Sequence, residues 1–416
     1  MTERSILVTV KLERDKSTWD VIERSNELTE LAKTAGAEII AEDISHRDVP
    51  TPDLYIGKGK ADDLAFNAAL KKVDLIIFNN DLSGTQIRNL EKTTSVRVVD
   101  RTQLILDIFA KRARSPEGKA QVELAQLEYK LPRLLGKGTE LSRLGGGIGT
   151  RGPGEQKLEE DRRRLRDRIM VLKGELKDLE LRRSTTRVKR DEHSLATIAF
   201  VGYTSAGKST LFNTLTGAKQ LISRGLFTTL DPLTRSISLS NNQKVLLSDT
   251  VGFISDLPHH LVEAFKATLE EVIEADILVH VLDISHPKAK DHYAAVQKVL
   301  DELGALEKTT ILCFNKIDLI QDKDNVERLL KENPGSVAIS ALQNTNLDKL
   351  LKRFEELSTS FVSELELSLP LDKMDLVDYI YSEGKVRDIQ YGDKQVRIKA
   401  LLPSISAQKL KAYISK

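Results

Sequence analysis

"LATIAFVGYTSAGKST", residues 195–210, is the stretch that decides the fold of this chain. Its apolar, β-branched first half predicts a buried strand, and Gly202, Gly207, Lys208 and Ser209 then satisfy the pattern G-x-x-x-x-G-K-[ST]. The next stretch, KSTLFNTLTG, predicts a helix. A strand, a glycine-rich turn and a helix N-terminus in this order form a phosphate-binding loop. We therefore expect a nucleotide here, with Lys208 at its phosphates and the Ser209 hydroxyl on Mg²⁺.

Two further motifs extend this site toward the γ-phosphate. The segment 249–252 (DTVG) ends the expected strand KVLLSD, where Asp249 can hold the Mg²⁺ shell through water and the Gly252 N–H can meet a γ-phosphate. Between it and the phosphate loop, LFTTLDP (226–232) is expected to form a switch loop, and its Thr229 offers a second hydroxyl to Mg²⁺. Lys208, Thr229 and Gly252 are thus the candidate catalytic groups.

Two later motifs predict which base is bound. The segment 315–318 (NKID) ends the strand TTILCF, and the Asp318 carboxylate can accept hydrogen bonds from the N1–H and exocyclic amine of guanine. Adenine lacks this pair of donors, so such a site discriminates by chemistry rather than by size. The segment 340–342 (SAL) would place a backbone N–H at guanine O6. Each motif is weak alone, but their order at successive strand ends predicts GTP binding.

The residues expected to contact GTP come from these five motifs. They are Gly202, Tyr203, Thr204, Ser205, Ala206, Gly207, Lys208, Ser209, Phe227, Thr228, Thr229, Leu230, Asp231, Asp249, Thr250, Val251, Gly252, Asn315, Lys316, Ile317, Asp318, Ser340, Ala341 and Leu342.

Phe253 follows the DTVG motif at the position where Ras-like proteins carry a glutamine that orients the attacking water. An apolar ring cannot polarise water, so hydrolysis must depend on Mg²⁺, Lys208, backbone amides and a group that a partner or the rearranged switch supplies. Slow intrinsic turnover is therefore expected. His259 and His260 could supply such a group, but we favour solvated or packing histidines at a helix start.

The whole chain predicts an α/β multidomain protein with four parts. The expected parts are an N-terminal α/β domain (1–110), a basic helical hairpin with a glycine-rich loop (111–193), a Ras-like P-loop GTPase domain (194–360) and a small α+β domain (361–416). The first part alternates β-branched runs with helical stretches, which predicts parallel βαβ units. The last part is expected to follow the order β-α-β-β-α.

The hairpin is expected to be a two-helix coiled coil with a positively charged surface. Leucines repeat at heptad spacing on both helices, forming narrow apolar seams. The net charge of the whole chain is +1, but residues 111–190 hold 22 Lys+Arg against 12 Asp+Glu. No acidic partner is expected near the basic clusters at 111–114, 162–164 and 182–183. The hairpin could simply be a stiff spacer, but its positive charge favours binding to RNA.

The loop between these helices contains GGGIGTRGPGEQ (145–156), in which Gly147, Gly149 and Gly152 match the dinucleotide pattern G-x-G-x-x-G. That pattern binds a nucleotide only after a strand, and here a charged helical stretch precedes it. A loop of some twenty residues is longer than the about 2 to 8 that a helical hairpin needs. We expect an RNA-probing tip whose contacts are Arg143, Gly145, Gly146, Gly147, Gly149 and Arg151.

Other features predict setting and minor roles. The single Cys313 forbids an internal disulfide and is expected to pack on a buried strand. No signal peptide and no membrane span are expected, which favours the cytoplasm. His280 is expected to be a satisfied core residue. GKGK at 57–60 could bind an anion, but an ordinary helix entry is favoured.

The motifs FTTLDP, DTVGFI-DLP and GTELSRLGGGIGTRGPGEQKLE resemble the HflX family of ribosome-associated GTPases. The resemblance covers about 360 of 416 residues and omits the small C-terminal domain, which only some members carry. It implies Mg²⁺ as cofactor, and GTP or GDP and the rRNA of the large ribosomal subunit as partners. It further implies splitting or rescue of stalled or idle ribosomes, especially under stress. We expect a monomer that is partly ribosome-associated.

Two other functions stay open. A GTPase that remodels free RNA would be stimulated by naked RNA. A signalling GTPase that uses the N-terminal domain as its effector module would not sediment with ribosomes.

Overall fold

A computed structural model of the chain describes residues 2–13, 19–134, 153–191, 195–218, 225–255, 266–358, 362–392 and 394–414. The chain divides into two compact units. The first contains most of Met1–Leu179 together with the later segment Ser223–Leu230, and the second contains the phosphate loop and the chain from Ala267 onward. Within the described ranges, no helix combines the length and apolar character that crossing a membrane requires.

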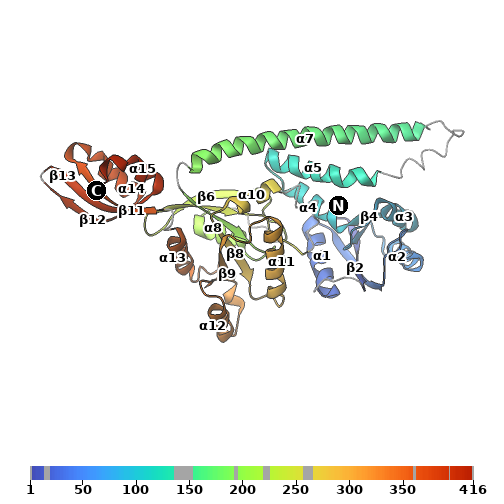
Figure 1. The fold of residues 1–416 in the computed structure, drawn as a ribbon. Helices are drawn as coiled ribbons and strands as arrows, with labels where there is room; N and C mark the ends of the chain where they lie inside the picture. Colours follow the sequence, from blue (N-terminus) through green and yellow to red (C-terminus); the bar gives the residue numbers. More distant parts are fainter. Residues whose placement is uncertain are drawn as a thin grey trace. The chain divides into compact units, whose positions relative to one another are not determined.

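The first unit begins with the predicted parallel α/β domain (Figure 1). Its elements are β1 (Arg4–Leu12), α1 (Val21–Ala35), β2 (Glu38–Arg47), α2 (Lys58–Lys71), β3 (Leu75–Phe78), α3 (Gly84–Thr94), β4 (Arg97–Asp100) and α4 (Arg101–Arg112). The strand order is β2-β1-β3-β4, and all neighbours are parallel. Residues 5–10 of β1 are all buried, as expected for an inner strand of a parallel sheet.

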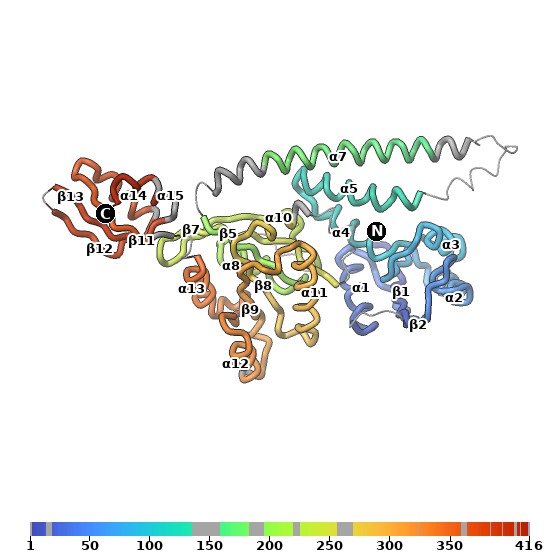
Figure 2. The backbone as a smooth tube through the Cα atoms, viewed as in Figure 1, coloured from blue at the N-terminus to red at the C-terminus, as the bar shows by residue number. Residues whose placement is uncertain are grey.

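The helical hairpin consists of α5 (Pro116–Arg133) and α7 (Pro153–Asp191), and α7 runs back along α5 (Figures 1 and 2). The predicted leucine seam joins them, because Leu124, Ile169 and Leu172 are buried against one another. Ion pairs flank the seam, from Arg168 to Glu123 and from Lys173 to Glu128. Since α7 is highly charged elsewhere, this narrow apolar stripe and the ion pairs beside it are what join it to α5 in the part of the hairpin that the structure describes.

One expectation about the hairpin charge is wrong. No acidic partner was expected near Arg162 and Arg164. In the structure Arg162 pairs with Glu159 at 3.6 Å, and Arg164 pairs with Glu160 at 2.8 Å. The reason is helical geometry, since residues three or four apart lie on the same face of a helix. The basic surface of this helix is therefore partly neutralised by its own preceding turn.

The second unit contains a six-stranded sheet with the order β10-β9-β8-β5-β7-β6. Its strands are β5 (Ala196–Val201), β6 (Leu233–Ser238), β7 (Lys244–Asp249), β8 (Ile277–Asp283), β9 (Thr309–Asn315) and β10 (Val337–Ala338). Its helices are α8 (Lys208–Thr216), α10 (Lys266–Glu274), α11 (Ala289–Glu302), α12 (Lys323–Glu332) and α13 (Leu347–Ser358). Among the described strands of this sheet, only β6 and β7 pair antiparallel. The carboxyl ends of the parallel strands therefore meet at one edge, where ligands bind in such sheets.

The chain ends in the predicted small α+β domain (Figure 2). Its elements are β11 (Val362–Pro370), α14 (Asp375–Glu383), β12 (Lys385–Tyr391), β13 (Gln395–Pro403) and α15 (Ser404–Lys409). The antiparallel sheet has the order β11-β13-β12, and Ile414 adds a single bridge to Leu367 on the outer side of β11. Helix residues Val377 and Ile380 pack on the buried side chains of the strands.

Candidate functional site

The predicted phosphate loop joins the end of β5 to the first turn of α8. Gly202 has φ 155° and Gly207 has φ 99°. A Cβ on Gly202 would lie 2.3 Å from the carbonyl oxygen of Val281, and one on Gly207 would lie 2.2 Å from Nδ2 of Asn315. Both positions therefore require glycine, for backbone conformation and for space. The chain wraps around the N-terminus of α8, and the N–H groups of a helix N-terminus favour an anion.

Lys208 is buried at the start of α8. Its ammonium donates to the carbonyl oxygens of Gly202 at 3.0 Å and Tyr203 at 2.9 Å. Burial lowers the pKa of Lys208 to about 8, and the neighbouring Asp249 carboxylate acts in the opposite direction. The lysine thus still carries its charge at neutral pH. The loop holds a fixed cation where the phosphates of a nucleotide are expected.

The DTVG segment continues from β7 along the phosphate loop. The Phe253 N–H donates to the carbonyl of Gly202 at 3.1 Å, and the Thr204 N–H donates to the carbonyl of Phe253 at 2.7 Å. Gly252 is close to the lysine, because a Cβ there would lie 3.1 Å from Nζ of Lys208. The Phe253 ring is buried, so this position offers no polar side chain. The structure therefore brings the first two predicted motifs together.

Asn315 links the phosphate loop to the two base-recognition motifs. Its Nδ2 donates to the carbonyl of Ala206 at 2.8 Å, and its Oδ1 accepts from the N–H of Ala341 at 3.0 Å. The sequence pattern did not assign this bridging role to Asn315. It follows from the parallel order of β5, β8, β9 and β10, which brings their ends to one edge.

Asp318 has the properties expected of a guanine acceptor. Its Oδ1 is shielded from solvent and accepts no hydrogen bond from any described residue. A buried carboxylate oxygen without a donor is costly, and two N–H groups of guanine would satisfy it. Lys316 pairs with Asp283 at 2.6 Å, while Ser340 and Ala341 are buried. The interpretation of this edge as a guanine site remains a prediction.

The expected switch loop is divided between the two compact units. Phe227, Thr228, Thr229 and Leu230 belong to the first compact unit, whereas Asp231 belongs to the second. The Leu226 N–H donates to Oγ1 of Thr34 in α1 at 3.0 Å. The Phe227 ring packs against Phe109 of α4. Thr229, the expected second Mg²⁺ ligand, is buried in this segment.

The donor set at the phosphate loop suits magnesium. Mg²⁺ prefers oxygen ligands, and in the second unit the predicted set contains the Ser209 hydroxyl and the Asp249 carboxylate, whereas the predicted ligand Thr229 belongs to the first unit. Asp249 is fully buried at the end of β7 and close enough to Lys208 to affect its pKa. Within the described ranges, no group of three or more His, Cys, Asp or Glu forms another candidate metal site.

His280 differs in part from its prediction. It is fully buried in β8 and stacks on Tyr293, with ring centroids 5.0 Å apart, as expected of a core residue. Its Nε2, however, has no hydrogen-bond partner among the described residues. Burial, aided by the charge of Lys208, lowers the pKa of His280 to about 3. The imidazole is therefore neutral, and the expectation of a satisfied core residue holds for its burial but not for Nε2.

The remaining predicted features have plain structural roles or lie outside the described residues. Burial raises the pKa of the Cys313 thiol, as expected for a packing residue. In 57–60, the Arg47 guanidinium lies against Gly57 and Lys60 pairs with Asp43 at 2.7 Å, which favours an ordinary helix entry. His259, His260 and the predicted RNA contacts Arg143, Gly145, Gly146, Gly147, Gly149 and Arg151 lie outside the described residues.

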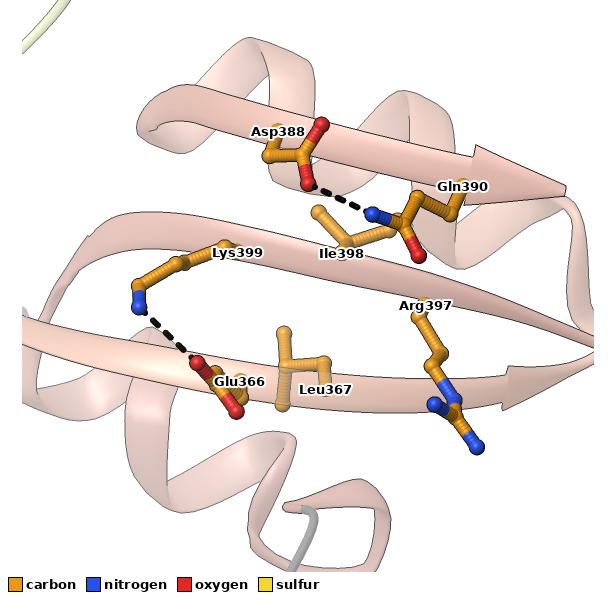
Figure 3. Close-up of a pocket in the computed structure, with 7 residues that line it drawn as sticks. All are labelled: Glu366, Leu367, Asp388, Gln390, Arg397, Ile398 and Lys399. Atoms are coloured by element: carbon orange, nitrogen blue, oxygen red, sulfur yellow. Dashed lines mark hydrogen bonds and ion pairs between the residues drawn. The ribbon is translucent and has the colours of Figure 1, made fainter.

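A separate hollow of about 220 Å³ lies on the sheet of the C-terminal domain (Figure 3). It is lined by Glu366, Leu367, Asp388, Gln390, Arg397, Ile398 and Lys399. Lys399 pairs with Glu366 at 2.9 Å, and this hydrogen bond lowers the pKa of Glu366. Charges of both signs are mixed here, and the hollow shares no residue with the nucleotide motifs.

Three protein-family models match the chain. One described as "GTP-binding GTPase N-terminal" matches residues 23–110, and one described as "GTP-binding GTPase Middle Region" matches residues 112–190. A third, described as "50S ribosome-binding GTPase", matches residues 197–316. The third match spans the phosphate loop and the DTVG segment.

Similar proteins match nearly the whole chain. "GTPase HflX" of Caldanaerobacter subterraneus subsp. tengcongensis is 46% identical over 412 residues, which cover 99% of this chain and 94% of that protein. "GTPase HflX" of Escherichia coli (strain K12) is 38% identical over 410 residues, which cover 98% and 95%. Among solved structures, a GTP-binding protein of Sulfolobus solfataricus in complex with GDP is 26% identical, with 86% and 99% covered and a TM-score of 0.45.

Proposed function

Because this chain belongs to the HflX family of GTP-hydrolysing proteins, we propose that it acts on the large ribosomal subunit and splits or rescues stalled or idle ribosomes, especially under stress. The observation that carries this proposal is the match of residues 197–316 to a family described as a 50S ribosome-binding GTPase. We further propose that the protein is cytoplasmic and monomeric, with a fraction bound to ribosomes.

The hairpin supports an RNA partner. Residues 111–190 carry ten more basic than acidic residues, although some of the arginines pair within α7. A cationic surface binds RNA phosphates with an affinity that falls steeply with salt. The proposed RNA contact is the glycine-rich loop between α5 and α7, where glycine lets the backbone approach RNA closely.

The root of that loop is held firmly. Arg133, the last residue of α5, donates to Asp100 at 3.1 Å and to the carbonyl of Leu82 at 2.9 Å. Asp100 is fully buried and also accepts the Tyr129 hydroxyl at 2.7 Å. These bonds join α5 to the N-terminal sheet within the first unit. A fixed root would let the loop enter a defined position on the ribosome rather than sample many.

The proposed nucleotide chemistry assigns each motif a task. The phosphate loop and Lys208 bind the β- and γ-phosphates, and the Gly252 N–H meets the γ-phosphate. Asp318 recognises guanine. Mg²⁺, when bound by Ser209 and Thr229 and by Asp249 through water, would neutralise charge on the phosphate oxygens. The buried Phe253 offers no group to orient water, so a ribosomal partner is expected to complete the site.

The experiment that tests this proposal compares GTP turnover with large subunits, with small subunits and with neither. We expect large subunits alone to accelerate hydrolysis many-fold, because they supply the missing group or reorder the switch. Equal rates in all three conditions would rule out a ribosome-stimulated GTPase. Naked RNA in place of subunits distinguishes the proposal from a free-RNA remodeller.

A further inference from the structure

A side chain of the phosphate loop holds the segment that follows DTVG. The hydroxyl of Tyr203 accepts the backbone N–H of Ser255 at 2.7 Å. Both residues are buried, with 5% and 3% of their surface exposed. Ser255 lies three residues after Gly252, the proposed γ-phosphate contact. The bond therefore joins the two parts of the site whose relative position matters for hydrolysis.

Stacked rings hold Tyr203 itself in place. The Tyr203 ring lies on His292 of α11, with centroids 4.0 Å apart and planes within 3°. His286 also stacks on His292, at 4.4 Å and 29°. The next residue of α11, Tyr293, stacks on His280 of β8. Because α11 is fixed at both contacts, the tyrosine hydroxyl has a defined position beside the loop.

The backbone of the same segment is also bonded to the phosphate loop. Phe253 exchanges two backbone hydrogen bonds with this loop, donating to Gly202 and accepting from Thr204. Gly252 has little freedom, because a Cβ there would lie 2.9 Å from Cγ2 of Thr204 and 3.1 Å from Nζ of Lys208. The bond from Ser255 to Tyr203 involves a side chain, so a substitution of Tyr203 can remove it and leave the two backbone hydrogen bonds of Phe253 in place.

We propose that Tyr203 is a positioning residue for GTP hydrolysis, whose hydroxyl holds Ser255 and thereby aims the Gly252 N–H at the γ-phosphate. This inference rests on the nucleotide site proposed above. Since Phe253 supplies no polar group, backbone donors are among the groups on which the transition state depends, and donors must be fixed before the reaction to be effective. GDP lacks the γ-phosphate, so its binding does not require this alignment.

The test measures hydrolysis and nucleotide affinity of full-length Tyr203→Phe. We expect kcat to fall at least about fivefold and affinity for a non-hydrolysable GTP analogue to fall with it, as for one lost buried hydrogen bond, while GDP affinity stays within about twofold. The matched control is Tyr293→Phe, which removes a hydroxyl one residue from the stack and should leave all three values unchanged. Unchanged kcat in Tyr203→Phe, or equal losses for GDP and the GTP analogue, would overturn the inference.

Two further variants separate the possible failures. His292→Ala should lower kcat as Tyr203→Phe does, because the ring that stacks on Tyr203 is lost. His292→Phe retains a flat ring and should keep kcat near the wild-type value. Wild-type kcat in His292→Ala would overturn the role of the stack. Lys208→Met should lose hydrolysis altogether. If Lys208→Met stays active, the proposed nucleotide site is wrong and the inference falls with it. If only Tyr203→Phe is unaffected, the site stands and the positioning role alone is wrong.

Discussion

The ring of Phe227 lies edge-on to the ring of Phe109, with centroids 4.6 Å apart and planes at 72°. Phe227 comes from the expected switch loop, whereas Phe109 lies in α4 of the N-terminal domain. Beside them, the Leu226 N–H donates to Oγ1 of Thr34 in α1. The segment 225–230 is thus held by two helices of the N-terminal domain in the first unit.

Thr34→Ala should loosen this segment locally. The substitution leaves the partly buried Leu226 N–H without its acceptor, which is worth about 1–3 kcal/mol. We expect hydrogen exchange at the Leu226 amide to accelerate roughly 5- to 150-fold, because each 1.4 kcal/mol is a factor of ten. Thr34→Ser keeps the hydroxyl and is the control. Equal exchange rates in the alanine and serine variants would show that this bond does not hold the segment.

Removal of the Arg133 guanidinium should destabilise the N-terminal domain. Arg133→Met leaves the fully buried Asp100 carboxylate without its ion-pair partner. Breaking such a pair from one side costs about 3–5 kcal/mol. The matched control is Arg164→Met, which removes an exposed pair on α7 and should cost less than about 1 kcal/mol. Urea unfolding measures both, and similar losses would contradict a buried anchor at the root of the loop.

The buried His280 should make the stability of the second unit depend on pH. Its pKa is about 3 in the folded chain against 6.5 for an unperturbed histidine, so the folded state binds fewer protons below pH 6.5. The contribution is present above pH 6.5 and is lost as pH falls toward 3. At about 1.36 kcal/mol per unit, the loss between pH 6.5 and pH 5 is about 2 kcal/mol.

Comparison with His280→Leu isolates this effect from other titrating groups. Leucine cannot bind a proton, so the free energy of unfolding of wild type should fall by about 2 kcal/mol relative to the variant between pH 6.5 and pH 5. Urea titrations at both pH values measure the difference. A pH dependence that is the same in both proteins would mean that His280 titrates normally.

Asp318→Asn tests the proposed guanine site. The two N–H donors of guanine require an anionic acceptor with two oxygens. The asparagine amide offers one oxygen, and its NH₂ group is itself a donor. A charge-assisted hydrogen bond is worth about 1.5–3 kcal/mol, so GTP affinity should fall roughly 10- to 150-fold. Asp348→Asn, an exposed aspartate of α13, is the control. Fluorescent nucleotide binding measures both, and wild-type affinity in Asp318→Asn would place the base elsewhere.

Sequence patterns predicted the helices and strands well, because each element is specified by residues that are close together in the sequence. The apolar run before Gly202 and the helix after Lys208 predicted the turn between β5 and α8, and heptad leucines predicted the contact of Leu124 with Leu172. The pairing of Arg162 with Glu159 was equally visible in the i,i+3 spacing. The expectation of an unpaired basic cluster failed because it left out the acidic residues in the preceding turn of the same helix.

Contacts between distant segments could not be predicted in this way. No local pattern indicates that Tyr203 stacks on His292, that Arg133 bonds to Asp100, or that Phe227 packs on Phe109. These contacts depend on how strands order themselves in a sheet and on which helices pack together. The missing partner of His280 Nε2 is of the same kind, since only the folded sheet determines its neighbours.

The glycine-rich loop has its own test. Replacement of residues 136–155 by a short Gly-Ser turn should leave GTP affinity intact, because the nucleotide motifs begin at Gly202. Ribosome splitting should be abolished, because the proposed RNA contact is lost. Light scattering of intact ribosomes measures splitting. Unchanged splitting would refute the assignment of the loop as an RNA contact.

Sedimentation with purified ribosomal subunits tests the central proposal most directly. The full chain is mixed with large subunits in the presence of a non-hydrolysable GTP analogue or GDP, and the bound fraction is measured. We predict that the chain pellets with the large subunit in the analogue and mostly stays in the supernatant with GDP. Absence from the pellet in both conditions, or equal binding with both nucleotides, would contradict a GTP-controlled factor of the large subunit.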